Sequence, residues 1–269
     1  MTAFTRRVAE LTGTSEDRIE RLAGGDLSEI LLLRRPDGRC TVAKSGPAVS
    51  TEAAMLRQLA GSFVAVPKVE GEHDHILLLE HVENDRVFSP AAWASIGTAL
   101  KKMHDHASDR YGWPVDYPLG TVELDNRQSS DWRGFWAEQR LVATARTLDR
   151  PWRERVGAAA ERVKALLPEA PRPSLLHGDL WTGNILVRDG AVAAFIDPAC
   201  YYGHAEVDLA MLSLFDAPPP EFYTAYGELD EGWEERRGAY QLFPALVHLR
   251  LFGDSYAGMA DRFLGRLAA

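Results

Sequence analysis

The sequence predicts an α+β fold in two lobes, a small β-rich N-terminal lobe and a mainly helical C-terminal lobe. Short apolar runs separated by turn residues dominate residues 1–83 and are typical of strands. From Ser89 onward, apolar residues recur at spacings of three and four, which is typical of amphipathic helices. We therefore expect one lobe over residues 1–83 and a second over residues 84–269, joined by the polar stretch Asn84-Asp85-Arg86.

Composition and charge argue against several classes of function. The chain has 269 residues and a formal net charge of −9, whereas nucleic-acid-binding proteins neutralise phosphates with an excess of Lys and Arg. No apolar stretch approaches the roughly 20 residues that span a bilayer, and the first residues lack the apolar run of a signal peptide. Two cysteines form neither a disulfide framework nor a metal-ligand pattern. We expect a soluble, cytoplasmic protein with no nucleic-acid or membrane partner, and a monomer as the default state.

The N-terminal lobe is expected to combine helices with antiparallel strands. Pro36-Asp37-Gly38 between two apolar runs is typical of a hairpin turn. Pro67 has no N–H to donate to a sheet, so its strand belongs at an edge. The expected elements are helices over residues 5–11 and 15–22, hairpin strands over 30–33 and 40–44, a helix over 51–59, an edge strand over 64–69 and a buried strand over 76–80.

Two features of this lobe indicate contact with a nucleotide. Gly24-Gly25, at the mouth of the hairpin, would let backbone amides approach a phosphate, although a plain turn also explains the pair. Lys44 ends a strand, and Glu52 lies in the first turn of the next helix. Kinase-like enzymes use such a lysine and glutamate to hold the α- and β-phosphates. Glu52 could equally serve only to complement the helix dipole.

The C-terminal lobe is expected to be mainly helical around one central stretch, residues 177–208. Trp132, Phe135 and Trp136 have a helical spacing that favours a core position over a ligand platform. A polar and aromatic loop over residues 111–126 has the length of a functional connection. The expected helices cover residues 91–106, 132–148, 153–167, 218–222 and 233–267.

The central stretch has the spacing of a phosphotransferase catalytic loop. His177-Gly178-Asp179 followed by Asn184 matches the kinase pattern H-R-D-x-x-x-x-N, with glycine in place of arginine. An aspartate in hydrogen-bond reach of a substrate hydroxyl can orient it and accept its proton. The asparagine can offer its amide oxygen to Mg²⁺. We predict that Asp179 is the catalytic base and Asn184 a metal ligand.

A hairpin after Asn184 provides a second metal ligand. Residues 185–187 and 191–196 are apolar runs around Arg188-Asp189-Gly190. A turn centred on Asp189 and Gly190 would place Asn184 opposite Phe195, with Asp197 on the same face as Asn184. Such diagonal neighbours lie roughly 7–8 Å apart, so a hard cation could bridge their oxygens. Asn184 and Asp197 are therefore the predicted Mg²⁺ pair.

Two other polar residues of the stretch are expected to support the loop. We expect His177 to shape the loop through hydrogen bonds and not to transfer protons. Asp208 either caps a helix or bonds the catalytic loop.

The chain resembles the protein-kinase-like fold of small-molecule kinases and, within it, a bacterial-type member of the fructosamine (ketosamine) kinase family. The similarity runs from about Gly24 to the C-terminus. Trp181 separates it from aminoglycoside and choline-type phosphotransferases, which share His-Gly-Asp and Asn. The segments that carry the resemblance are HGDLWTGN, FIDPACYYGHAEVDLAMLSLF, SDWRGFWAEQRL, EFYTAYGEL and YQLFPALVHLRLFGDSYAG.

The resemblance implies ATP-dependent phosphorylation of a sugar hydroxyl on a ketosamine, a step in protein deglycation. It implies that Trp181 and His204 contact the substrate. The acidic middle of residues 119–126 departs from the family's more proline-rich loop and bears on the choice of substrate. The implied nucleotide-binding residues are Gly25 and Ser28 in a GGD-type loop, Lys44 with Glu52, and a hinge of Glu80, His81 and Val82.

Two alternatives remain at this stage. An aminoglycoside- or choline-type phosphotransferase would use the same catalytic residues on a different acceptor. A catalytically inactive kinase fold would act as a binding module, but such a fold has usually lost catalytic or metal-binding residues. This sequence keeps all five of them: Lys44, Glu52, Asp179, Asn184 and Asp197.

Overall fold

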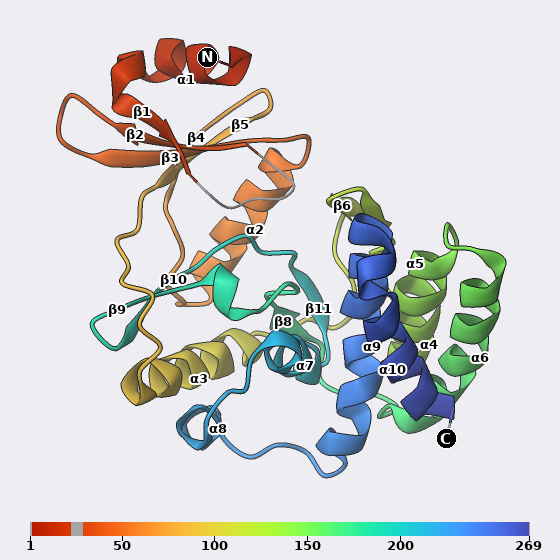
Figure 1. Ribbon diagram of the computed structural model, residues 1–269. Helices are drawn as coiled ribbons and strands as arrows, with labels where there is room; N and C mark the ends of the chain where they lie inside the picture. The colour runs from red at the N-terminus through yellow and green to blue at the C-terminus, as the bar shows by residue number, and fades with distance from the viewer. Residues whose placement is uncertain (1, 23–28, 269) are drawn as a thin grey trace.

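The computed structural model describes residues 2–22 and 29–268 and has the two-lobe α+β arrangement that the sequence predicts (Figure 1). The N-terminal part is a five-stranded antiparallel sheet in the order β1-β2-β3-β5-β4. Its elements are α1 (Ala3–Thr12), a 3₁₀ turn (Glu16–Arg18), β1 (Ile19–Arg21), β2 (Ile30–Arg34), β3 (Cys40–Ser45), α2 (Val49–Gly61), β4 (Val69–His73) and β5 (Ile76–Glu80).

Helices cover both faces of this sheet, which explains why its inner strands are continuous apolar runs. Successive side chains of a strand point to opposite faces. Leu78 accordingly packs in the cluster that contains Val8 of α1, whereas Leu77 and Leu79 pack in the cluster that contains Leu56 of α2. A strand that is buried on both faces has no polar alternation.

Two N-terminal predictions need correction. The helix expected over residues 15–22 is a 3₁₀ turn followed by strand β1, because Ile19 to Arg21 pair with Leu33 to Leu31 of β2 and sheet pairing overrides the helical spacing. The edge strand expected over residues 64–69 does lie at the edge of the sheet but covers Val69–His73, because pairing with β5 begins only after Pro67.

The C-terminal part is mainly helical and holds one large core. Its helices are α3 (Pro90–His104), α4 (Trp132–Gly134), a π-helix (Phe135–Val142), α5 (Ala143–Ala145), α6 (Arg150–Leu166), a 3₁₀ turn (Thr182–Asn184), α7 (Glu206–Phe215), α8 (Pro220–Tyr226), α9 (Trp233–Phe252), a 3₁₀ turn (Gly253–Tyr256) and α10 (Ala257–Ala268). Its strands form three antiparallel pairs, β6 (Tyr117–Leu119) with β7 (Val122–Leu124), β8 (Ser174–Leu176) with β11 (Tyr201–Gly203), and β9 (Ile185–Arg188) with β10 (Ala191–Phe195).

Local signals explain several of these boundaries. Ser89 caps α3 by accepting a hydrogen bond from the N–H of Ala92, and Pro90 follows at the first helical position. Gly253, with φ +72°, ends α9 and divides the single helix expected over residues 233–267. The segment expected to be a loop over residues 111–126 contains the short hairpin β6–β7.

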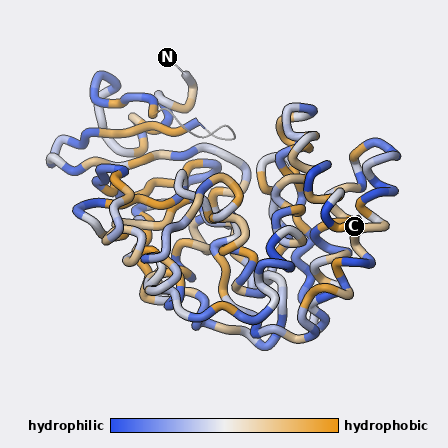
Figure 2. The backbone as a smooth tube through the Cα atoms, turned by 60° about the horizontal axis from the view of Figure 1, so that its bottom comes forward, coloured by the Kyte–Doolittle hydropathy of each residue, from blue (hydrophilic) through white to orange (hydrophobic). Residues whose placement is uncertain are grey.

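Hydropathy along the backbone agrees with this arrangement. In Figure 2 the helices at the right alternate hydrophobic and hydrophilic segments, as expected for helices with one face on a core. Within residues 2–22 and 29–268, none of the helices is long and apolar enough to span a bilayer.

The central stretch lies where the two parts meet. The N–H of Phe195 in β10 donates to the carbonyl of Ala65 at 2.9 Å, and the N–H of Asp85 donates to the carbonyl of Val187 in β9 at 2.9 Å. Residues 81–89, which connect the two parts, contain neither helix nor strand. The hairpin that follows the catalytic loop therefore contacts both the N-terminal part and the connection between the two parts.

Candidate active site

A buried aspartate holds the loop that follows β8. Both carboxylate oxygens of Asp208, on α7, accept hydrogen bonds from backbone N–H groups, from His177 at 2.7 Å and from Gly178 at 2.9 Å. Nε2 of His104, on α3, lies 3.2 Å from the same carboxylate. Of the two roles predicted for Asp208, bonding to the catalytic loop is confirmed.

Gly178 stands where kinases of the H-R-D type have arginine, and the backbone explains the substitution. Its φ is +81°, and a Cβ at this position would lie 1.9 Å from the carbonyl oxygen of Ala199. A side chain would therefore clash with the segment that follows Asp197. Glycine is required by both the conformation and the close approach.

His177 is fully buried and braces the loop from within. Its Nε2 lies 3.0 Å from the carbonyl oxygen of Ile196, and its Nδ1 lies 3.4 Å from the N–H of Asp179. An Nε2–H donor and an Nδ1 acceptor satisfy both contacts, which is the neutral tautomer. Burial lowers the pKa of His177 below its usual value, although Asp208 opposes this. The predicted loop-shaping role agrees with this geometry.

Asp179 and Asn184 face each other across the loop. The amide nitrogen of Asn184 donates to the carbonyl of Asp179 at 2.8 Å and to its carboxylate at 3.1 Å. With the nitrogen used in this way, the amide oxygen is the atom left for a cation. Burial raises the pKa of Asp179 to about 7, with smaller contributions from Asp197 and Asp208, and the Asn184 bond opposes the rise. Such a carboxyl is poised to exchange a proton near neutral pH.

The predicted hairpin exists, but its register differs from the expected one. Ala191 pairs with Arg188 as predicted, and a bulge between Val192 and Ala194 then shifts the pairing by one residue. Asn184 therefore lies opposite Ile196, whose N–H donates to the Asn184 carbonyl at 3.0 Å, and not opposite Phe195. The diagonal argument for a metal pair is wrong in this detail.

Asp197 reaches the site through an unusual backbone conformation. Its φ is +55°, in the left-handed region that non-glycine residues rarely adopt. Strain of this kind is typical of functional positions. The conformation turns the chain after β10, and the Asp197 side chain bonds Lys44 on β3.

Lys44 makes the central ion contacts of the site. Its Nζ lies 2.7 and 2.8 Å from the carboxylate oxygens of Glu52, on α2, and 2.8 Å from a carboxylate oxygen of Asp197. Burial alone would lower the pKa of Lys44, but the two carboxylates outweigh it and raise the pKa above its usual value. Lys44 and Glu52, which the sequence predicts as a pair, are therefore in contact, and Lys44 also contacts Asp197.

The remaining predicted nucleotide contacts lie at two other places. Glu80, His81 and Val82 form the end of β5 and the start of the connection between the lobes. The N–H of His81 is directed to the carbonyl of Cys40 at 3.3 Å, and the carbonyl of Val82 accepts from the Asn84 side chain. Gly25 and Ser28 lie outside the described residues.

The two predicted substrate residues occupy different environments. Trp181 follows Asp179 by two residues and is 39% exposed, with its ring over Gly183. His204 is buried, and its Nδ1 lies 2.7 Å from the hydroxyl of Tyr240. A small, mainly apolar cavity beside Asp179 includes Tyr240 but not His204 in its wall. His204 thus contacts a residue of the cavity wall without being part of that wall, whereas the family resemblance implies direct contact of His204 with the substrate. The cavity is lined by Leu119, Gly178, Asp179, Val207, Met211, Tyr240, Phe243, Pro244, Val247 and His248.

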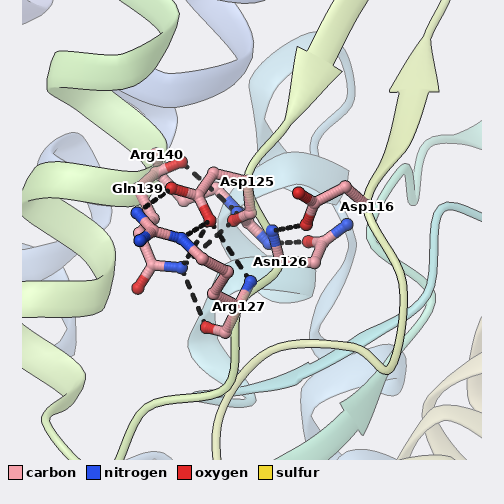
Figure 3. A network of polar contacts seen from close by, with 6 residues as sticks. All are labelled: Asp116, Asp125, Asn126, Arg127, Gln139 and Arg140. Atoms are coloured by element: carbon pink, nitrogen blue, oxygen red, sulfur yellow. Dashed lines mark hydrogen bonds and ion pairs between the residues drawn. The ribbon is translucent and has the colours of Figure 1, made fainter.

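The segment that carries Leu119 is anchored by contacts that the sequence did not reveal. Figure 3 shows Arg140 and Gln139, on the π-helix, directed toward residues 125–127. Arg140 is fully buried and donates to the carbonyl of Asp125 at 2.7 Å and to the side chain of Asn126 at 2.6 Å. The hydroxyl of Tyr117 donates to the carbonyl of Ala199 at 2.7 Å. A charged residue within an aromatic helix is the one sequence signal for this anchor.

The chain is similar to known proteins over nearly its whole length. The family model described as fructosamine kinase matches residues 1–269. The chain is 32% identical over 263 residues to an Enterococcus faecium protein named "Probable ketoamine kinase", covering 90% of this chain and 92% of that protein. A solved structure of a Thermobifida fusca protein described as a fructosamine-3-kinase has 30% identity and a TM-score of 0.87, covering 99% and 98% of the two chains.

A more distant structure shows how widely the fold is shared. A macrolide 2′-phosphotransferase from Brachybacterium faecium has 19% identity and a TM-score of 0.61, covering 97% of this chain and 95% of that one. This similarity supports the protein-kinase-like phosphotransferase fold alone. The family match over the whole chain is the finding that identifies the protein, which belongs to the fructosamine kinase family.

Proposed function

We propose that this protein transfers the γ-phosphoryl group of ATP to a sugar hydroxyl of a ketosamine, with Asp179 as the base and Lys44, Glu52, Asn184 and Asp197 around the phosphates. The observation that carries the proposal is the contact of Lys44 with both Glu52 and Asp197 at 2.7–2.8 Å. That contact joins the sheet, α2 and the end of the β9–β10 hairpin, which is the assembly that phosphoryl transfer requires in kinases.

The oxygen donors around Asp197 suit a hard divalent cation such as Mg²⁺. The amide oxygen of Asn184 is left for a ligand, and the side chain of Asp197 is 38% exposed. Carboxylate and amide oxygens are typical Mg²⁺ ligands. When bound, Mg²⁺ would neutralise charge on the phosphates. Lys44 would then turn from Asp197 toward the phosphate oxygens, and Glu52 would keep it oriented.

Asp179 is proposed to act on the acceptor hydroxyl. Its position on a loop braced by His177 and Asp208 fixes the carboxylate, and positioning supplies much of the rate in such reactions. A pKa raised to about 7 by burial makes the carboxylate a stronger base toward the hydroxyl proton. Trp181 is proposed to lie against the ketosamine. We further propose a cytoplasmic monomer, and the lobe boundary at residues 83 and 84.

A substrate panel tests the proposal. ATP consumption is measured with ketosamines of several sugars beside aminoglycoside and choline acceptors, and mass analysis identifies the phosphorylated position. We expect turnover with ketosamines and its loss in a folded Asp179→Ala variant. Turnover only with an antibiotic or with choline would reject the ketosamine assignment. Full activity of Asp179→Ala would reject the role of Asp179.

A further inference from the structure

Exposed apolar side chains are few in the described residues, and several of them gather at the catalytic loop. Among residues 2–22 and 29–268, the large apolar side chains that are exposed are Phe63, Val87, Val115, Trp181, Phe215 and Phe252. Trp181, Phe215 and Phe252 are 39%, 42% and 39% exposed and belong to one chain of ring contacts. Single exposed apolar residues are ordinary, but a contiguous group usually marks a binding surface.

Five rings make up this group, which we call the aromatic ladder: Trp181, Phe215, His248, Phe252 and Tyr256. The ring of Trp181 meets that of Phe215 at 6.3 Å between centroids, and Phe215 meets His248 at 5.3 Å. His248 then contacts Phe252 at 5.6 Å and Tyr256 at 4.9 Å. The ladder thus joins the catalytic loop to the end of α7, the end of α9 and the 3₁₀ turn after it.

The ladder begins at the proposed chemistry. Trp181 lies two residues after Asp179, and His248 belongs both to the ladder and to the wall of the cavity beside Asp179. The ladder therefore leads from that cavity to the exposed rings of Phe215 and Phe252. A molecule with one end at Asp179 can place its other end on these rings.

The inner end of the ladder is rigid. A Cβ at Gly183 would lie 2.2 Å from the Trp181 ring, so glycine allows the ring to lie over the loop. The hydroxyl of Thr182 donates to Asp216 at 2.9 Å, and a guanidinium N–H of Arg86 donates to the carbonyl of Gly183 at 3.0 Å. These bonds hold the two residues that directly follow Trp181. Such preorganisation favours binding, because little freedom is lost on contact.

The five rings of the ladder carry no charge themselves, including that of His248. Nδ1 of His248 lies 2.8 Å from the carbonyl of Pro244, one turn earlier in α9, and so carries the proton. Burial lowers the pKa of His248 below its usual value. The ring is therefore neutral at pH 7, with Nε2 as an acceptor. Apolar and aromatic groups suit such a face, and a cation suits the aromatic faces near Trp181.

We infer that the aromatic ladder binds the substituent on the amine of the ketosamine and favours an apolar or aromatic one. The inference rests on the proposed function. A ketosamine consists of a sugar half and an amine half, and in the proposed function a hydroxyl of the sugar half lies against Asp179. The amine half then extends from the cavity along the ladder, with its ammonium near Trp181 and its substituent on Phe215 and Phe252.

Two substrates with the same sugar test this inference, one made from methylamine and one from benzylamine. We expect the wild-type protein to have a lower KM for the benzylamine adduct, by about 3- to 10-fold, since aromatic pairs contribute in this range. Phe215→Ala and Phe252→Ala are each expected to reduce this preference to below about twofold. Phe63→Ala, which removes an exposed ring far from the ladder in sequence and contact, is the matched control and should leave both substrates unaffected.

The outcomes separate the inference from the proposed function. Turnover of neither adduct would overturn the proposed function and the inference with it. Turnover of both with equal KM, or an equal loss for both in the two variants, would overturn only the inference. A wild-type dimer that Phe252→Ala converts to monomers, detected by sedimentation, would show that a second copy occupies the ladder and would also overturn it.

Discussion

Two buried ion clusters in this protein are made of similar groups but differ in charge balance. In the Lys44 cluster, one ammonium contacts the carboxylates of Glu52 and Asp197. In the Arg236 cluster, one guanidinium makes paired hydrogen bonds to the single carboxylate of Glu206 and donates to the carbonyl of Glu231. The first cluster has an excess negative charge, and the second is balanced.

This difference is the one we expect between a cluster that binds a ligand and a cluster that stabilises the fold. The excess charge of the Lys44 cluster sits on Asp197, whose side chain is 38% exposed and can accept a cation. His204, Glu206 and Asp230 have oxygen and nitrogen atoms within 4.8 Å of one another, the composition of a metal site. Arg236 already neutralises Glu206, however, and the hydrogen bond between the two side chains raises the pKa of Arg236 above its usual value. Residue types alone would have given both clusters the same interpretation.

The largest expected effect comes from removing the charge of Asp197. Asp197→Asn should lower kcat/KM by about 10³-fold, because charge stabilisation in the transferring phosphoryl group is usually the largest catalytic contribution. The variant should remain folded, since Lys44 keeps its ion pair with Glu52. Asp230→Asn, which removes an exposed carboxylate beside the Arg236 cluster, is the control and should stay within about twofold of wild type. Steady-state kinetics with a ketosamine would contradict the prediction if Asp197→Asn kept a tenth of the activity.

A smaller effect, on stability, is expected from the Arg236 cluster. Arg236→Met leaves the buried Glu206 without its partner and should lower the free energy of unfolding by about 3 kcal/mol. The double variant Arg236→Met with Glu206→Met should recover much of that loss, because no buried charge remains. Urea denaturation measures both. A single variant as stable as wild type would show that the cluster is not a buried pair in solution.

The base of the proposed reaction should cost stability in a pH-dependent way. The pKa of Asp179 rises from 3.8 to about 7 on folding, so ionisation destabilises the folded state progressively between pH 4 and 7. The side chain introduced by Asp179→Asn cannot ionise, so the variant should be more stable than wild type by about 1–2 kcal/mol at pH 7.5. The full effect of a pKa shift is about 1.4 kcal/mol per unit. We expect less than this limit because the residue is partly exposed to solvent.

Thermal melts without nucleotide or Mg²⁺ measure this difference. The gap between the two proteins should be small at pH 4, widen up to pH 7 and then remain constant. A gap that is constant over the whole range would contradict the raised pKa.

Contacts between residues close together in the sequence could be predicted, because local geometry determines how far apart such residues lie. The Asp179 to Asn184 interval lies within one loop, and Lys44 with Glu52 spans one strand and the next helix, so local geometry brings each pair together. The register of the β9–β10 hairpin was missed because a bulge adds one unpaired residue without a sequence signature.

Contacts between distant segments were also beyond the sequence. Arg140 bonds the Asn126 side chain, and His104 lies against Asp208, only because the C-terminal lobe packs those segments together. The family resemblance implies that His204 contacts the substrate, whereas in the structure its Nδ1 contacts the hydroxyl of Tyr240. Tertiary packing decides which polar residues near a motif face the ligand.

The smallest effect is expected from a third cluster, which repeats the Lys44 contacts at the surface. Nζ of Lys164 lies 2.7 Å from Glu138 and 2.8 Å from Glu161, an ammonium between two carboxylates as around Lys44, but the side chains are 30%, 51% and 73% exposed. Water screens such pairs, so Lys164→Met should change the free energy of unfolding by less than about 0.5 kcal/mol, and less still in high salt. Urea titrations at two salt concentrations measure this change. A loss as large as that of Arg236→Met would mean that contact distance, and not burial and charge balance, distinguishes the clusters.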